Sequence, residues 1–98
     1  LQEIRKDKTS HEFDLLLART CEALGETDAA QKKYAELVKV FPGEEARCRY
    51  ALFLKNQGKA DEANRLFGEI IKNARLSPRY YKKVQKKWID VAKKELVS

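Results

Sequence analysis

Several residue types are scarce in this 98-residue chain, and each scarcity argues against a class of fold or of function. The sequence has two prolines, four glycines and no run of alternating β-branched residues, a composition that favours helices over a sheet. It contains neither an apolar run long enough to cross a membrane nor a signal peptide. Methionine is absent and the chain begins at Leu1, so we expect a fragment or a processed product of a longer protein.

Residues that carry catalysis or bind metals are scarce as well. His11 is the single histidine, and we interpret it as a solvated residue at a helix start. Cys21 and Cys48 have no paired Cys or His at the spacing of a zinc site, so they behave as small hydrophobic residues, with a disulfide between them as the alternative. Unpaired thiols favour a reducing compartment and a cytoplasmic location. Without a phosphate-binding loop or a nucleophile motif, we predict no enzyme activity, no cofactor and no metal.

Two stretches, residues 15–38 and 48–71, repeat each other at an offset of 33 residues. The identical pairs are Ala18/Ala51, Gly25/Gly58, Asp28/Asp61, Ala30/Ala63 and Glu36/Glu69. Self-similarity at such a period is typical of stacked helical repeats, which hold partners and rarely carry chemistry of their own. The sequence therefore indicates a binding protein more clearly than it indicates what is bound.

The repeated positions have a physical interpretation in a helical fold. The alanines let two helices cross closely, and Tyr34 and Phe67 fill the next layer of the core. Gly25 and Gly58 are expected to end helices in the left-handed conformation, with a generic loop role as the alternative. We predict helices over about 10–24, 28–41, 44–57, 60–74 and 78–96. Thr9 with Glu12 fits a capping box for the first helix, and Ser77 followed by Pro78 fits the start of the fifth.

The spacing of Gly25, Ala30, Tyr34 and Pro42 resembles the tetratricopeptide repeat of the divergent bacterial type, and the second unit matches it with Gly58, Ala63 and Phe67 but has Arg75 in place of the proline. The resemblance implies an all-α fold of helical hairpin repeats with a C-terminal capping helix. Repeat 1 then covers 11–43, repeat 2 covers 44–77, and the capping helix covers 78–96. These form one domain over 10–98, preceded by a linker or the stump of an earlier helix at 1–9. Gln85 departs from the family pattern, because a small residue is expected at its position.

The resemblance also implies where a partner binds, because first helices of such repeats line a concave groove. Carried onto this chain, the groove residues are Leu15, Arg19, Arg49, Leu52, Lys55, Arg79, Lys83 and Lys86. We expect an apolar floor beside a cationic wall, with Arg49, Arg79 and Lys83 converging next to Leu52. The two arginines could grip a carboxylate with paired hydrogen bonds. The implied function is a protein–protein interaction module, or scaffold, that binds an acidic peptide.

The C-terminal part of the chain is strongly basic. Residues 72–98 hold nine Lys/Arg against Asp90 and Glu95, a concentration that attracts acidic partners. The expected capping helix also carries an apolar stripe that should face the second repeat: Tyr81, Val84, Trp88, Val91 and Leu96. We expect Trp88 to be largely buried and the lysines of this helix to form its solvated side.

Two other partners stay open for the basic helix. Nucleic acid could be held by the lysines, with Tyr80, Tyr81 and Trp88 stacking on bases. A membrane surface could receive a basic amphipathic helix that carries a tryptophan. Both compete with the core for the same aromatic residues, so an acidic protein segment is the preferred hypothesis and nucleic acid is the alternative.

Overall fold

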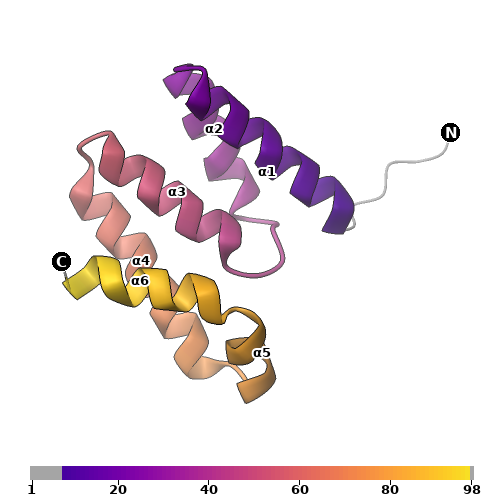
Figure 1. The fold of residues 1–98 in the computed structure, drawn as a ribbon, viewed down its shortest axis with the longest axis vertical. Helices are drawn as coiled ribbons and strands as arrows, with labels where there is room; N and C mark the ends of the chain where they lie inside the picture. Colours follow the sequence, from indigo (N-terminus) through magenta and orange to yellow (C-terminus); the bar gives the residue numbers. More distant parts are fainter. Residues whose placement is uncertain (1–7, 98) are drawn as a thin grey trace, which may run out of the picture. The chain divides into compact units, whose positions relative to one another are not determined.

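The computed structural model describes residues 8–97, and this range contains helices and no strand (Figure 1). The helices are α1 Lys8–Ala23, α2 Thr27–Leu37, α3 Glu45–Asn56, α4 Ala60–Leu76, α5 Arg79–Val84 and α6 Lys86–Val97. The predicted all-α class is confirmed. A search of the described helices for one long and apolar enough to span a membrane finds none.

The start of the chain differs from the prediction. The expected linker at residues 1–9 lies outside the described residues, except for Lys8 and Thr9, which already belong to α1. The side chain of Thr9 is likewise outside the described residues, and so is the capping box that was predicted for it.

The helices form two compact units that divide between Pro42 and Gly43. In unit 1, α1 and α2 pack together as a helical hairpin, and in unit 2 α3 and α4 form a second one (Figure 1). In unit 2, α6 packs mainly against α4 and also contacts α3. Each hairpin thus contains one of the two segments that repeat in the sequence.

The repeated small and large apolar residues lie in the interior, as predicted. Ala30 and Tyr34 on α2 are buried, and so are Ala63 and Phe67 at the corresponding places of α4. The Tyr34 hydroxyl donates to Oε1 of Glu22 on α1 at 2.7 Å, so its polar end is satisfied while its ring is buried. Small side chains at these places allow the two helices of a hairpin to approach closely.

Gly25 and Gly58 end α1 and α3 in the same manner, which confirms their predicted role. Their φ angles are 80° and 81°, in the left-handed region that glycine adopts without a Cβ penalty. After Gly58, the Lys59 N–H donates to the Leu54 carbonyl at 2.9 Å, the long bond of a Schellman motif, and an equivalent bond of 2.9 Å closes α1. The repeat in the sequence is therefore also a repeat of local geometry.

The single C-terminal helix predicted at 78–96 is wrong, because the chain breaks at Gln85 and forms α5 and α6. Gln85 has φ −97° and ψ 12°, and its own N–H still bonds to Tyr81 in α5 while its carbonyl accepts the N–H of Trp88 at 3.0 Å. Its side-chain Oε1 accepts the backbone N–H of Glu44 at 2.9 Å. The break is thus held by a contact with the start of α3 in the same unit.

The predicted capping role of Ser77 is also wrong. Its hydroxyl donates to the Asn73 carbonyl at 2.6 Å, which satisfies the end of α4, and Pro78 occupies the cap position of α5. Ser77 therefore ends one helix and does not start the next.

The apolar stripe predicted for the last helix is only partly its packing face. The buried residues of α6 are Ile89 and Ala92, whereas Val84 on α5 is exposed and Trp88 is half-buried. The expectation that Trp88 faces the second repeat and not solvent is met in part, because its ring is half-buried with Arg49 of α3 over it. Since the chain breaks at Gln85, one helical stripe does not run through both α5 and α6.

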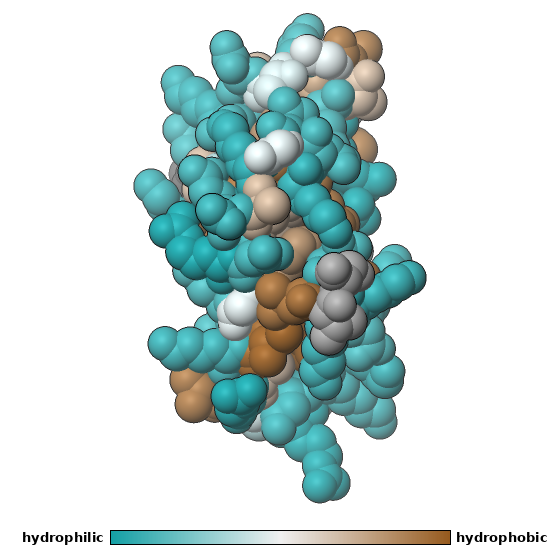
Figure 2. All heavy atoms as spheres, turned by 90° about the vertical axis from the view of Figure 1, so that its left-hand side faces the viewer, coloured by the Kyte–Doolittle hydropathy of each residue, from teal (hydrophilic) through white to brown (hydrophobic). Residues whose placement is uncertain are grey.

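The described helices turn a solvated surface outward. On the face drawn in Figure 2, most atoms are hydrophilic and hydrophobic atoms reach the surface mainly as a narrow strip. This agrees with a sequence in which 37% of residues are charged.

Two glycines of unit 2 should respond to alanine in opposite directions. At both Gly68, inside α4, and Gly58, a Cβ would meet nothing within 4 Å, but Gly58 has φ 81°. Gly68→Ala should raise the free energy of unfolding by about 0.5–1 kcal/mol through backbone entropy. Gly58→Ala should lower it by about 1–2 kcal/mol, because the left-handed backbone is strained for alanine. Urea unfolding followed by circular dichroism measures both, and shifts of the same sign would contradict the helix ends described above.

Candidate functional site

A cleft of about 650 Å³ lies in unit 2 between α4 and the α5–α6 segment. Its apolar lining consists of Ile71 and Ala74 from α4 and Ile89 from α6. The remaining lining residues are one carboxylate, Asp90, and six cations: Arg75, Arg79, Lys82, Lys83, Lys86 and Lys93. We call this site the basic cleft.

Most cations of the basic cleft have no acidic partner. Lys86 pairs with Asp90 at 2.6 Å across one turn of α6. The other five are exposed, and none forms an ion pair with another residue of the described range 8–97: Arg75, Arg79, Lys82, Lys83 and Lys93. Uncompensated charges of one sign along a cleft raise the local potential and attract anions.

The repulsion between like charges in the basic cleft lowers the stability of α5, which carries three of the six cations. Arg79 and Lys83 are four residues apart within α5, so this pair lies on one face of the helix, whereas Lys82 and Lys86 lie on either side of the break at Gln85. Like charges at this spacing destabilise a helix by about 0.2–0.5 kcal/mol per pair. Helix stability alone therefore does not account for this arrangement.

The structure divides the groove residues that the family resemblance predicted. Arg79, Lys83 and Lys86 line the basic cleft, whereas Arg49 and Leu52 on α3 do not. The structure therefore does not place Arg49 and Leu52 in the cleft that Arg79 and Lys83 line.

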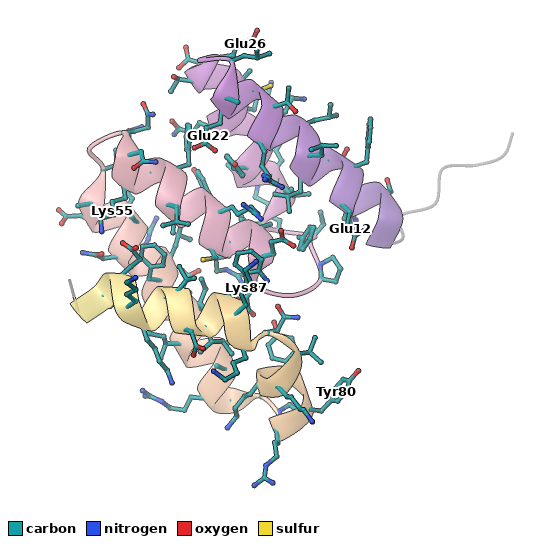
Figure 3. All side chains as sticks on the ribbon, in the orientation of Figure 1. Glu12, Glu22, Glu26, Lys55, Tyr80 and Lys87 are labelled. Carbon is teal, nitrogen blue, oxygen red and sulfur yellow. The ribbon has the colours of Figure 1, made fainter. Side chains whose placement is uncertain are left out.

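The reason is that α6 lies against α3, so that charged side chains of α3 contact residues of α6. The Arg49 guanidinium lies 5.0 Å from the centroid of the Trp88 ring on α6, and its Nε donates to Glu45 at 2.9 Å. Lys55, labelled in Figure 3, pairs with Glu95 on α6. This face of α3 is therefore engaged within the unit.

Two predicted groove residues belong to unit 1. Leu15 is 4% exposed, so the prediction that it forms a groove floor is wrong. The neighbouring Leu16 is the exposed residue of the pair. Arg19 is exposed on α1, and its part in binding stays a prediction.

The residue that sequence reasoning missed is Glu44, a buried carboxylate that is 2% exposed. Its Oε1 accepts a bond from Nη1 of Arg47 at 2.7 Å. Its Oε2 accepts a bond from the Tyr81 hydroxyl on α5 and a long one, 3.5 Å, from Nδ2 of Asn73 on α4. Burial of a carboxylate is tolerated only when it is paired and hydrogen-bonded in this way. Glu44 therefore connects the start of α3 with α4 and α5.

A local signal for Glu44 exists in the sequence, but it is incomplete. Glu44 precedes Arg47 by three residues, the spacing of an ion pair within a helix. It also follows a glycine, Gly43, which is typical of a turn. In the structure this glycine has φ 103°, and a Cβ there would lie 2.9 Å from the Gln85 amide. These signals point to a special loop before α3, but they do not reveal Tyr81 as the distant partner.

The aromatic residues proposed for base stacking are mostly engaged within unit 2. Nζ of Lys87 lies 4.8 Å from the centroid of the Trp88 ring, in addition to the guanidinium already described. Burial, together with the hydrogen bond to Glu44, raises the pKa of Tyr81 well above its usual value. Tyr80 is 78% exposed and points away from α5 (Figure 3). Of the three, Tyr80 alone is fully available to a ligand.

The two thiols differ in their surroundings. Cys48 on α3 is buried, and burial raises its pKa to about 11 although the Arg49 charge opposes the shift. Cys21 on α1 is half-buried, and neither cysteine is in a disulfide. Within residues 8–97, no group of three or more His, Cys, Asp or Glu side chains is placed to hold a metal ion.

Comparisons with known proteins add no family to this description. Models of protein families, curated protein sequences and solved structures all gave no match. The geometry of the basic cleft is therefore the observation from which a function is argued.

The raised pKa of Cys48 predicts a pH-dependent stability. Because the pKa is about 11 in the fold and 9.0 when unperturbed, the stabilising contribution is complete below pH 9.0 and is lost as the pH rises toward 11. Cys48→Ala should remove this part of the alkaline decline, whereas Cys21→Ala should retain it. Urea unfolding at a series of pH values in the presence of a reductant measures the decline, and identical slopes for the two variants would refute the assignment.

Proposed function

We propose that this chain is a protein-interaction module that binds an acidic, partly apolar segment of a partner protein in the basic cleft. The observation that carries the proposal is the set of five cations without acidic partners around an apolar lining. A surface of this kind lowers the free energy of an anion that carries apolar side chains more than that of any other common ligand.

The chemistry of the cleft defines the segment further. Arg79 can bind a carboxylate through two parallel hydrogen bonds, and Lys83 supplies a second positive charge one turn away. Ile71 and Ile89 offer surface against which an aliphatic or aromatic side chain of the partner can be buried. A peptide that alternates carboxylates with large apolar residues can contact both the cations and the apolar lining of the cleft.

The proposal includes a tetratricopeptide-like architecture and a role without catalysis. Two hairpins with the same glycine-ended first helix at an offset of 33 residues support the repeat. A buried thiol with a raised pKa is a poor nucleophile, so Cys48 is not suited to catalysis, which supports a role of the chain in binding. The two cysteines outside disulfides suit a reducing compartment such as the cytoplasm.

Nucleic acid is the second candidate, and one observation favours it. Tyr80 is exposed beside Arg79, so one base could stack on its ring while the cations contact phosphates. The engagement of Trp88 and Tyr81 within unit 2 argues against a longer stacking surface.

Fluorescence anisotropy with a labelled nine-residue peptide of alternating glutamate and leucine tests the proposal. Arg79→Ala and Lys83→Ala should each raise the Kd by about tenfold or more, since each removes a charge-assisted hydrogen bond. Arg65→Ala is the matched control, because Arg65 is an exposed arginine on α4 outside the cleft. Equal effects at Arg65 and Arg79 would mean nonspecific attraction.

A single-stranded oligonucleotide serves as the competing probe. Tighter binding of the oligonucleotide than of the peptide, with a steep salt dependence and a loss on Tyr80→Ala, would replace the proposed function by the nucleic-acid alternative. Failure of both probes to bind would overturn the assignment of the basic cleft as an anion-binding site.

A further inference from the structure

Helix α5, which carries three of the six cations of the basic cleft, is weakly packed. Arg79, Lys82 and Lys83 all lie on α5, which has six residues and none of them buried. Its main helix contact is with α6, its neighbour in the chain, whereas α4 packs extensively with both α3 and α6. Few buried apolar contacts make a segment prone to local opening.

Hydrogen bonds to Glu44 hold α5 in place, although α5 has no buried side chain. The Glu44 carboxylate accepts the hydroxyl of Tyr81 in the middle of α5, and the Glu44 backbone N–H donates to Gln85 at the end of α5. The carboxylate is itself held by Arg47 at 2.7 Å and is buried. A polar contact made by a buried charge is costly to break, because the charge is left without a partner.

We propose that the Glu44–Tyr81 contact is a latch that positions α5 and thereby sets the affinity of the basic cleft. Tyr81 is then a positioning residue, because it does not line the cleft and acts through the cations of its helix. The statement about affinity rests on the proposed function, whereas the statement that the latch holds α5 does not.

The consequence for binding follows from the population of the latched state. If only a fraction of molecules holds α5 in place, the apparent Kd is the intrinsic Kd divided by that fraction. Binding and latching are coupled reciprocally, so a ligand that contacts Arg79 and Lys83 also favours the latched position of Tyr81.

The chain offers a matched pair of variants, Tyr81→Phe and Tyr80→Phe. Each removes one hydroxyl, changes no charge near neutral pH and leaves the residues that line the cleft intact. Tyr80 is exposed, and its hydroxyl forms no hydrogen bond with another residue of the range 8–97, so it controls for the chemical change. An effect confined to Tyr81 therefore reports the position of α5.

Two measurements on the whole chain test the latch, at a temperature where all variants are folded. Tyr81→Phe should raise the Kd for the glutamate–leucine peptide by about threefold to tenfold, and Tyr80→Phe should leave it unchanged. Amide exchange by NMR should accelerate by about tenfold at Lys82 in α5 and at Gln85 directly after it on Tyr81→Phe, while amides of α4 keep their rates.

The two measurements separate the latch from the proposed function. Faster α5 exchange with weaker peptide binding supports the whole inference. If the unaltered chain does not bind the peptide, the proposed function fails, and the exchange rates alone decide whether the latch exists. Unchanged α5 exchange in Tyr81→Phe would overturn the latch whatever the Kd. Acceleration in α4 as well as α5 would show a general loss of stability and would overturn it too.

Discussion

The arrangement of unit 2 depends on one buried carboxylate. Glu44 is 2% exposed, and an ionised group of this kind costs several kcal/mol to bury unless partners satisfy it. Arg47 comes from the same helix, but the Tyr81 hydroxyl comes from α5 and an amide contact comes from Gln85 at the break between helices. These demands are met from one side of the C-terminal segment, because Tyr81 and Gln85 are four residues apart and lie one helical turn from each other. The contact with Gln85 explains the glycine at position 43, where a Cβ would crowd the Gln85 amide.

The basic cleft follows from the same constraint. Since α5 is held at Glu44, its cations are presented on the side of α4, where Ile71 and Ala74 supply apolar surface. The positive charges repel one another along the helix and find no acidic partner in the described part of the chain, so the cleft stores unfavourable electrostatic energy that an anionic ligand relieves. In the proposed account, stability and binding both depend on this contact, because the buried Glu44 carboxylate holds the helix whose cations attract an anionic ligand.

Much of the local structure could be predicted from the sequence, and the site only in part. The repeat located Gly58 as a helix end and Ala63 with Phe67 as core, because these depend on local geometry and periodicity. The break at Gln85 and the engagement of Arg49 by Trp88 could not be predicted, since they depend on pairs distant in sequence, such as Glu44 and Tyr81, which are 37 residues apart. Leu15 was assigned to a groove because the family resemblance places its repeat position there, whereas the structure buries it and exposes the neighbouring Leu16.

The most direct test of the account is to locate the anionic ligand on unit 2. Chemical shifts of the isotopically labelled chain should be recorded during titration with the glutamate–leucine peptide at physiological salt. We predict perturbations that gather at the basic cleft, at Ile71, Arg79, Lys83 and Ile89, with residues 49–55 of α3 unaffected. Perturbations confined to α3, or to unit 1, would contradict the cleft as the binding site and the role of the buried carboxylate in shaping it.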